Sequence, residues 1–94
     1  CLLVDDDRLQ LELTASLMKR YNFSCVCCEH PKEVLGLLSD QKFDFVFTDI
    51  QMPELSGFEL VRLIRASDLP EVRSIPVVAL CLIMNFYQRV LRHI

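Results

Sequence analysis

Short apolar runs alternate with longer amphipathic stretches along this chain. Such alternation is typical of β-α units, in which helices connect the parallel strands of a sheet. The apolar runs are short and mostly hydrophobic throughout, as expected for strands that are buried on both faces. They predict four strands, over residues 1–4, 23–28, 43–48 and 77–80. The pattern therefore predicts an α/β fold.

The stretches between these runs predict three helices. In the first, Leu9, Leu13 and Leu17 recur at intervals of four residues, which is the spacing of one helix face. Pro31 suits the first turn of the second helix. The third helix follows a loop over residues 50–57. Each helix thus connects two strands, as a parallel sheet requires.

Composition limits the class of protein. The 94 residues suit one small domain, and the 52% hydrophobic content excludes a disordered tail. Ten Lys and Arg against thirteen Asp and Glu give a net charge of −3, which argues against nucleic-acid binding. No apolar run reaches the roughly 18 residues that cross a membrane. The chain begins at Cys1 with neither an initiator Met nor a signal peptide, so we interpret it as a piece of a longer protein.

Five cysteines, three of them within residues 25–28, raise the question of disulfides or a metal site. An odd, clustered set does not suit a disulfide framework. Alternation along the predicted strand puts Cys27 on the opposite face from Cys28, so the cluster cannot form a tetrahedral metal site. We interpret these cysteines as small hydrophobic residues of a cytoplasmic protein.

Three carboxylates follow predicted strands: Asp5 and Asp6 come after the first, and Asp49 after the third. Ligands of an open parallel sheet bind beyond the carboxyl ends of its strands, so the three side chains converge if these strands are neighbours. Converging negative charges repel one another unless a cation lies among them, and Mg²⁺ prefers oxygen ligands. A carboxylate beside Mg²⁺ can also act as a nucleophile. Alternatively, such residues only cap helices, which we expect of Asp7.

The motifs around these carboxylates resemble a known family. Residues 3–7 read Leu-Val-Asp-Asp-Asp, residues 49–53 read Asp-Ile-Gln-Met-Pro, and residues 56–60 read Ser-Gly-Phe-Glu-Leu. Over residues 1–82 the chain resembles the receiver domain of bacterial two-component response regulators, and it is most similar to receivers of hybrid sensor histidine kinases. The resemblance implies one receiver domain over residues 1–94, with a flavodoxin-like, doubly wound parallel sheet of strand order 2-1-3-4-5.

By this resemblance, Asp49 is the phosphoryl acceptor of a Mg²⁺-dependent phosphorelay, and a phosphohistidine on a histidine kinase or its phosphotransfer domain is the donor. Asp5, Asp6 and Asp49 would bind Mg²⁺ together with the backbone carbonyl of Gln51. Gly57 would occupy a position that needs backbone freedom or close packing. A receiver is itself a signalling module, although its parent could be a membrane-anchored hybrid sensor kinase. We expect no membrane or nucleic-acid contact by this chain, and a homodimer is left open.

The end of the chain departs from the family pattern. Cys81 stands where receivers carry a Ser or Thr that contacts the phosphoryl group, and a thiol is a weak hydrogen-bond donor. No Lys follows Lys42, and no fifth strand is evident, which would leave the fourth strand as an exposed edge. Apolar residues at helical spacing predict a closing helix over residues 83–94. About 25–30 residues, one βα unit with the family's Lys, are therefore either omitted from the printed chain or absent from the protein.

Two other functions remain open. A pseudo-receiver would bind partners without phosphorylation, which Cys81 and the absence of a late Lys favour. The spacing of Asp5 and Asp7 also resembles the nucleophile motif of haloacid-dehalogenase-type phosphatases, although those chains are much longer. Failure to accept a phosphoryl group would indicate the first, and hydrolysis of a small phosphorylated substrate would indicate the second.

Overall fold

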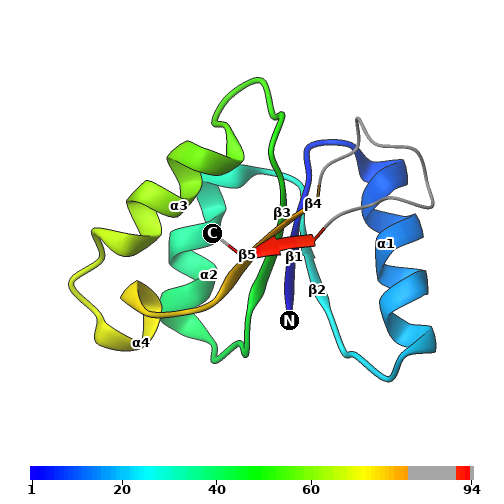
Figure 1. The fold of residues 1–94 in the computed structure, drawn as a ribbon, viewed down its shortest axis with the longest axis horizontal. Coiled ribbons are helices and arrows are strands. Elements are labelled where there is room, and N and C mark those ends of the chain that lie inside the picture. Colours follow the sequence, from blue (N-terminus) through cyan, green and yellow to red (C-terminus); the bar gives the residue numbers. More distant parts are fainter. Residues whose placement is uncertain (81–90, 94) are drawn as a thin grey trace.

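The computed structural model describes residues 1–80 and 91–93, which form one sheet flanked by helices (Figure 1). The elements are β1 (Leu2–Val4), α1 (Arg8–Arg20), β2 (Val26–Cys28), the 3₁₀ turn η1 (Pro31–Glu33), α2 (Val34–Asp40), β3 (Val46–Asp49), α3 (Gly57–Arg65), α4 (Pro70–Arg73), β4 (Val77–Leu80) and β5 (Leu91–His93). Every helix in this part of the chain is too short or too polar to span a bilayer. The predicted α/β fold is confirmed.

The sheet has the strand order β2-β1-β3-β4-β5. Its first four strands are parallel, and β5 runs antiparallel to β4. Val4 of β1 is in register with Cys28 of β2 on one side and with Thr48 of β3 on the other. β1 and β3 are therefore neighbours at the centre of the sheet, which is the condition for their carboxyl-terminal residues to meet.

Helices cover both faces of this sheet (Figure 1). α1 lies on one face, over a small core cluster that includes Leu3 and Phe47. α2, α3 and α4 lie on the other face, over a larger cluster that includes Leu2 and Val46. All residues of β1 and β3 are buried, and successive residues of a strand point to opposite faces. These two short strands therefore contribute to both clusters.

β2 and β3 begin later than predicted, whereas β4 spans the predicted residues and the order of the strands along the chain is as predicted. β2 starts at Val26 and β3 at Val46, each three residues after the start of the predicted run. A hydrogen-bonded ladder can extend no further than its shorter partner, and β1 has three residues. The flanking residues Phe23 and Phe45 instead pack edge to face, with ring centroids 5.7 Å apart.

α1 forms where predicted but buries a different face. The repeat that predicts this helix consists of Leu9, Leu13 and Leu17, which are 63%, 57% and 43% exposed. We call these three residues the leucine stripe. Leu11 and Met18, which are seven residues and thus two turns apart, are buried against the sheet instead. The helix therefore leaves an apolar face uncovered by the described residues.

The end of the chain corrects two expectations. Residues 91–93 form β5, so the prediction of a helix over residues 83–94 is wrong at these positions. β5 is a fifth strand that the sequence did not reveal, and it pairs with β4 in antiparallel orientation, so the expected exposed edge of β4 is covered. The free edge of an apolar strand presents unpaired N–H and C=O groups, and an extended segment satisfies them. Cys81 and the rest of the predicted closing helix lie outside the described residues.

Candidate functional site

The central strands bring three carboxylates together. β1 and β3 are parallel neighbours, so Asp5, which follows β1, lies beside Asp49, the last residue of β3. One carboxylate oxygen from each of Asp5, Asp6 and Asp49 lies within 4.8 Å of the other two. Asp5 and Asp49 are buried, whereas Asp6 is exposed. The predicted convergence of the three side chains is therefore observed.

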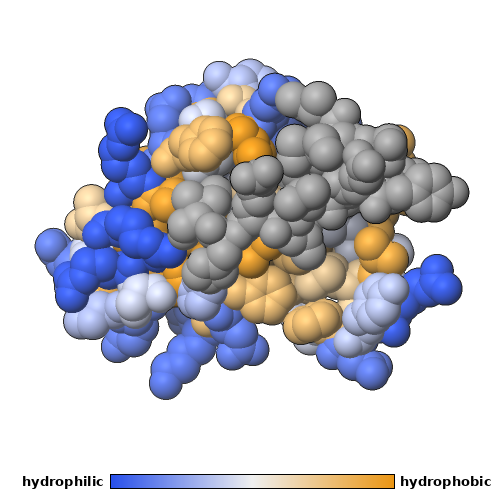
Figure 2. Space-filling view, in the orientation of Figure 1, coloured by the Kyte–Doolittle hydropathy of each residue, from blue (hydrophilic) through white to orange (hydrophobic). Residues whose placement is uncertain are grey.

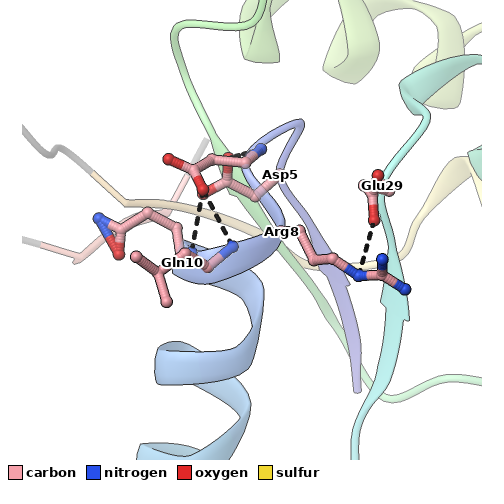
Figure 3. Close-up of polar contacts among 6 residues, drawn as sticks. Asp5, Arg8, Gln10 and Glu29 are labelled. Carbon is pink, nitrogen blue, oxygen red and sulfur yellow. Dashed lines mark hydrogen bonds and ion pairs between the residues drawn. The ribbon is translucent and has the colours of Figure 1, made fainter.

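The turn from β1 into α1 is held by its own aspartates. Asp5 Oδ1 accepts a hydrogen bond from the backbone N–H of Asp7 at 2.9 Å. Asp7 Oδ1 accepts from the N–H of Leu9 at 3.0 Å and from that of Gln10 at 3.3 Å, which caps the helix. These bonds are dashed in Figure 3, where Gln10 and Arg8 lie on different sides of the helix start. The expected capping role of Asp7 is confirmed, and it fixes the path of the turn that carries Asp6.

The loop after β3 is held closely against the strand end. Asp49 Oδ1 accepts from the N–H of Gln51 at 3.3 Å. The N–H of Gly57 donates to the carbonyl of Ile50 at 2.8 Å. A Cβ atom at Gly57 would lie 2.6 Å from the carbonyl oxygen of Asp49, which no side chain tolerates without movement. The expectation that Gly57 serves close packing is thus confirmed. Its backbone angle φ is not positive, so glycine's conformational freedom is not the reason.

Burial and mutual repulsion both oppose ionisation of Asp5 and Asp49. Burial raises the pKa of Asp5 to about 6, and the charges of Asp49 and Asp6 add to this effect. Burial also raises the pKa of Asp49, against the hydrogen bonds from the N–H groups of Gln51 and Ile50. Within the described residues no Lys or Arg forms an ion pair with the three carboxylates; Arg8, for example, pairs with Glu29 at 3.6 Å (Figure 3). Clustered hard oxygen ligands without a cationic partner fit a divalent cation such as Mg²⁺.

The structure also adds residues that the sequence analysis did not single out. A cavity of about 10 Å³ lies behind the cluster, lined by Leu3, Val4, Asp5, Leu11, Thr14, Phe47, Thr48 and Asp49. This volume suits one water molecule, and Thr14 is one of the polar residues that line it. Gln10 Oε1 is buried without a hydrogen-bond partner among the described residues. Neither residue stands in a recognisable motif, so only the packing of α1 on the strands reveals them.

The other predicted site residues are not placed at the cluster by the described structure. Cys81 lies outside the described residues. Cys28 of β2 belongs to the larger core cluster, whereas Cys25, which precedes β2, packs against the smaller one, so the clustered cysteines lie on both faces of the sheet. Burial raises the pKa of both thiols.

Comparisons with known proteins agree with this arrangement. The sequence profile of the response regulator receiver domain matches residues 1–85. The chain is 44% identical over 68 residues to probable histidine kinase 4 of Oryza sativa subsp. japonica, a match that covers 71% of this chain and 7% of that protein. The chain thus spans less than a tenth of the length of that relative.

Solved receivers share the fold. A response regulator receiver protein from Pseudomonas putida superposes with a TM-score of 0.76 at 27% identity, over 85% of this chain and 64% of that one. The response regulator protein TrrA from Thermotoga maritima, solved in complex with Mg²⁺ and BeF, superposes with a TM-score of 0.75 at 25% identity, over 93% and 71%. The match of the family profile to most of the chain, together with the sheet order and the carboxylate cluster, shows that this chain belongs to the response regulator receiver domain family.

Proposed function

We propose that this chain is the phosphoryl-accepting receiver of a two-component phosphorelay, with Asp49 as the acceptor. The observation that carries the proposal is the convergence of Asp5, Asp6 and Asp49 within 4.8 Å at the end of the central strands. We further propose that residues 1–94 are a single domain of a longer, cytoplasmic signalling protein of the hybrid histidine kinase type. In that chain, about 25–30 further residues with a Lys that faces Asp49 would complete the domain.

In the proposed reaction, a carboxylate oxygen of Asp49 attacks the phosphorus atom of a phosphohistidine. The new P–O bond forms as the P–N bond breaks, and the imidazole nitrogen keeps the electron pair and takes a proton from solvent. The N–H of Gln51 binds Oδ1 of Asp49, which orients the carboxylate and leaves Oδ2 without this bond. The burial of Asp49 keeps water away from the acyl phosphate that results.

We propose that Asp5, Asp6 and Asp49, with the backbone carbonyl of Gln51, hold Mg²⁺. The cation would neutralise negative charge on the carboxylates and on the transferred phosphoryl group. The acidic cluster and the Mg²⁺ complex of the related receiver support this assignment. Asp5 contributes from a fixed position, because the Asp7 N–H binds its Oδ1.

The proposed donor is a helical histidine kinase or phosphotransfer domain. The leucine stripe supports this partner, because it lies along α1, which begins three residues after Asp5, and it is apolar and exposed. An amphipathic helix of a partner binds such a stripe through its own apolar face. A second copy of this chain is the alternative occupant, and light scattering of the purified protein distinguishes a dimer from a monomer.

Acetyl phosphate and Mg²⁺ test the acceptor directly. We expect the wild-type protein to gain the mass of one phosphoryl group, and Asp49→Asn to gain none. Asp68→Asn, which removes an exposed carboxylate elsewhere, should be labelled like the wild type. Full labelling of Asp49→Asn would refute the assignment. An unlabelled wild type would favour the phosphorylation-independent pseudo-receiver, and continuous release of phosphate from small phosphorylated substrates would favour the phosphatase.

A further inference from the structure

A groove lies at the end of the sheet opposite to the carboxylate cluster. It has a volume of about 470 Å³ and is lined by Leu38, Ser39, Asp40, Gln41, Lys42, Phe43, Asp44, Leu69, Glu71, Val72 and Ile75. These residues come from the end of α2, from the connection into the start of β3, and from the segment around α4 that leads into β4. We propose that this groove binds a basic segment of a partner protein, in which Lys or Arg residues flank large apolar side chains.

The floor of the groove supplies the apolar part of this recognition. Leu38, Val72 and Ile75 are buried in the larger core cluster and present their remaining surface to the groove. Phe43 is half-buried beside them, and Leu69 is 42% exposed. An apolar side chain from a partner would therefore remove the exposed surface of Leu69 and Phe43 from water, while the buried floor supplies close packing.

The rim supplies the charge. Asp40, Asp44 and Glu71 are exposed carboxylates, and Lys42 is the one cation among the described residues that line the groove. Among the residues that the structure describes, none of these three carboxylates forms an ion pair. Figure 2 shows hydrophilic side chains around the lower left of the molecule, where α4 lies, with apolar surface inward of them. The excess of negative charge is complementary to a basic partner and repels an acidic one.

The spacing of these carboxylates favours a protein segment over a metal ion. Within the described residues, the metal-like group of three ligands within 4.8 Å consists of Asp5, Asp6 and Asp49, and no rim residue belongs to it. Charges that are spread around an apolar floor instead suit cations that are spread along a chain, with apolar side chains between them. Peptide segments are recognised in this way by grooves that separate an apolar pocket from a charged rim.

The segment around α4 that forms one wall of the groove is fixed by hydrogen bonds from a side chain outside the groove. Arg65 of α3 donates from Nη1 to the carbonyl oxygens of Arg73 at 2.9 Å and Ile75 at 2.6 Å. These bonds tie α4 and the start of β4 to α3. A preformed groove loses little conformational entropy when a partner binds. Since Phe43 and Ile75 precede β3 and β4 whereas Asp49 ends β3, a bound segment would leave the carboxylate cluster open.

Fluorescence anisotropy with a labelled, end-capped peptide Arg-Leu-Trp-Lys-Arg tests the proposal on the full protein chain. We expect saturable binding that weakens with salt, and much weaker binding of the matched peptide Glu-Leu-Trp-Glu-Glu. Leu69→Ser and Asp44→Lys should each weaken binding by about fivefold or more, as loss of a central contact does. Asp49→Asn should leave the affinity unchanged, which separates this groove from the proposed phosphorylation.

Leu63→Ser and Asp68→Lys are the matched controls, because both residues are exposed outside the groove, and they should change the affinity by less than about twofold. Amide shifts of the wild type on peptide addition give a second measurement that needs no variant, and they should map to residues 38–44 and 69–75. Absence of saturable binding, equal binding of the acidic peptide, or shifts centred on α1 would overturn the proposal. So would a dimer of this chain that Leu69→Ser dissociates.

Discussion

The carboxyl group of Asp5 holds its proton more tightly in the folded chain than in the unfolded one. Burial is the main cause, and the charges of Asp49 and Asp6 add to it, so the pKa rises from 3.8 to about 6. As the pH increases through this range, the unfolded chain loses the proton first, and the free energy of unfolding therefore falls. The proton thus stabilises the fold below about pH 4, and this contribution is lost above about pH 6.

We expect Asp5→Asn to raise the melting temperature by about 5 °C or more at pH 7.5 in EDTA. The amide oxygen can still accept the N–H of Asp7, and a buried charge is removed. At pH 4 the gain should nearly vanish, because the wild-type carboxyl is then protonated in the folded chain. Thermal melts at both pH values measure the effect, with the exposed Asp68→Asn as the control. An equal gain in melting temperature at both pH values would contradict the assignment of a buried negative charge to Asp5 at pH 7.5.

Asp6 allows the cation to be tested without disturbing the core, because its side chain is exposed. We expect Asp6→Asn to weaken Mg²⁺ binding by about tenfold or more, since it removes one of three clustered carboxylates. Asp7→Asn keeps a capping side chain and should weaken binding by less than about threefold. Titration calorimetry measures both. Equal affinities for the wild type and Asp6→Asn would exclude Asp6 as a ligand.

Gly57 sets how closely α3 approaches β3. Its Cβ position is occupied by backbone, with the Asp49 carbonyl oxygen at 2.6 Å and the Ile50 Cα at 2.9 Å. Gly36 in α2 has the opposite surroundings, because, apart from its chain neighbours and the backbone of its own helix, no heavy atom of the described residues lies within 4 Å of its Cβ position. The two glycines of the chain therefore allow the same substitution to be compared in two elements.

We expect Gly57→Ala to lower the free energy of unfolding by about 1–3 kcal/mol, because the strand end or the helix must shift. Gly36→Ala should instead raise it by about 0.4–1 kcal/mol, since alanine favours the helix and restricts the unfolded chain. Urea unfolding measures both. Phosphorylation by acetyl phosphate should be slower in Gly57→Ala alone. Similar free energies of unfolding for the two variants would show that the close approach at Gly57 does not constrain the packing of α3 against β3.

Sequence patterns predicted the elements better than they predicted how these pack. The apolar runs at β1 and β4 could be recognised because buried parallel strands are hydrophobic on both faces. The exposed face of α1 could not be recognised from the sequence, because Leu9 and Leu13 form a more regular repeat than the buried Leu11 and Met18. The convergence of the three aspartates could be predicted, because the carboxyl ends of neighbouring parallel strands meet at one edge of the sheet. β5 was missed because three residues carry too little periodicity to separate a strand from a helix.

At the scale of the whole molecule, the leucine stripe and the groove are two separate surfaces on which we propose that partners bind. We expect Leu13→Glu to slow phosphoryl transfer from a phosphorylated histidine kinase by about tenfold, because a charge on the stripe opposes apolar docking. Labelling by acetyl phosphate, which needs no docking, should not change. Leu63→Glu on α3 is the control at similar exposure. Equal slowing with both donors would point to damage at Asp49 rather than to lost docking.

The position of Asp49 in the central strand also determines which parts of the backbone could move on phosphorylation. β3 is paired on both sides, by β1 and β4, and all of its residues are buried. Its amide hydrogens should exchange with solvent only when the whole sheet opens, whereas those around Asp6 should exchange through local fluctuations. The backbone that carries the proposed acceptor therefore resists local opening. A phosphoryl group on Asp49 would move the exposed turn at Asp6 and the loop at Gln51, and hydrogen exchange would detect the change there first.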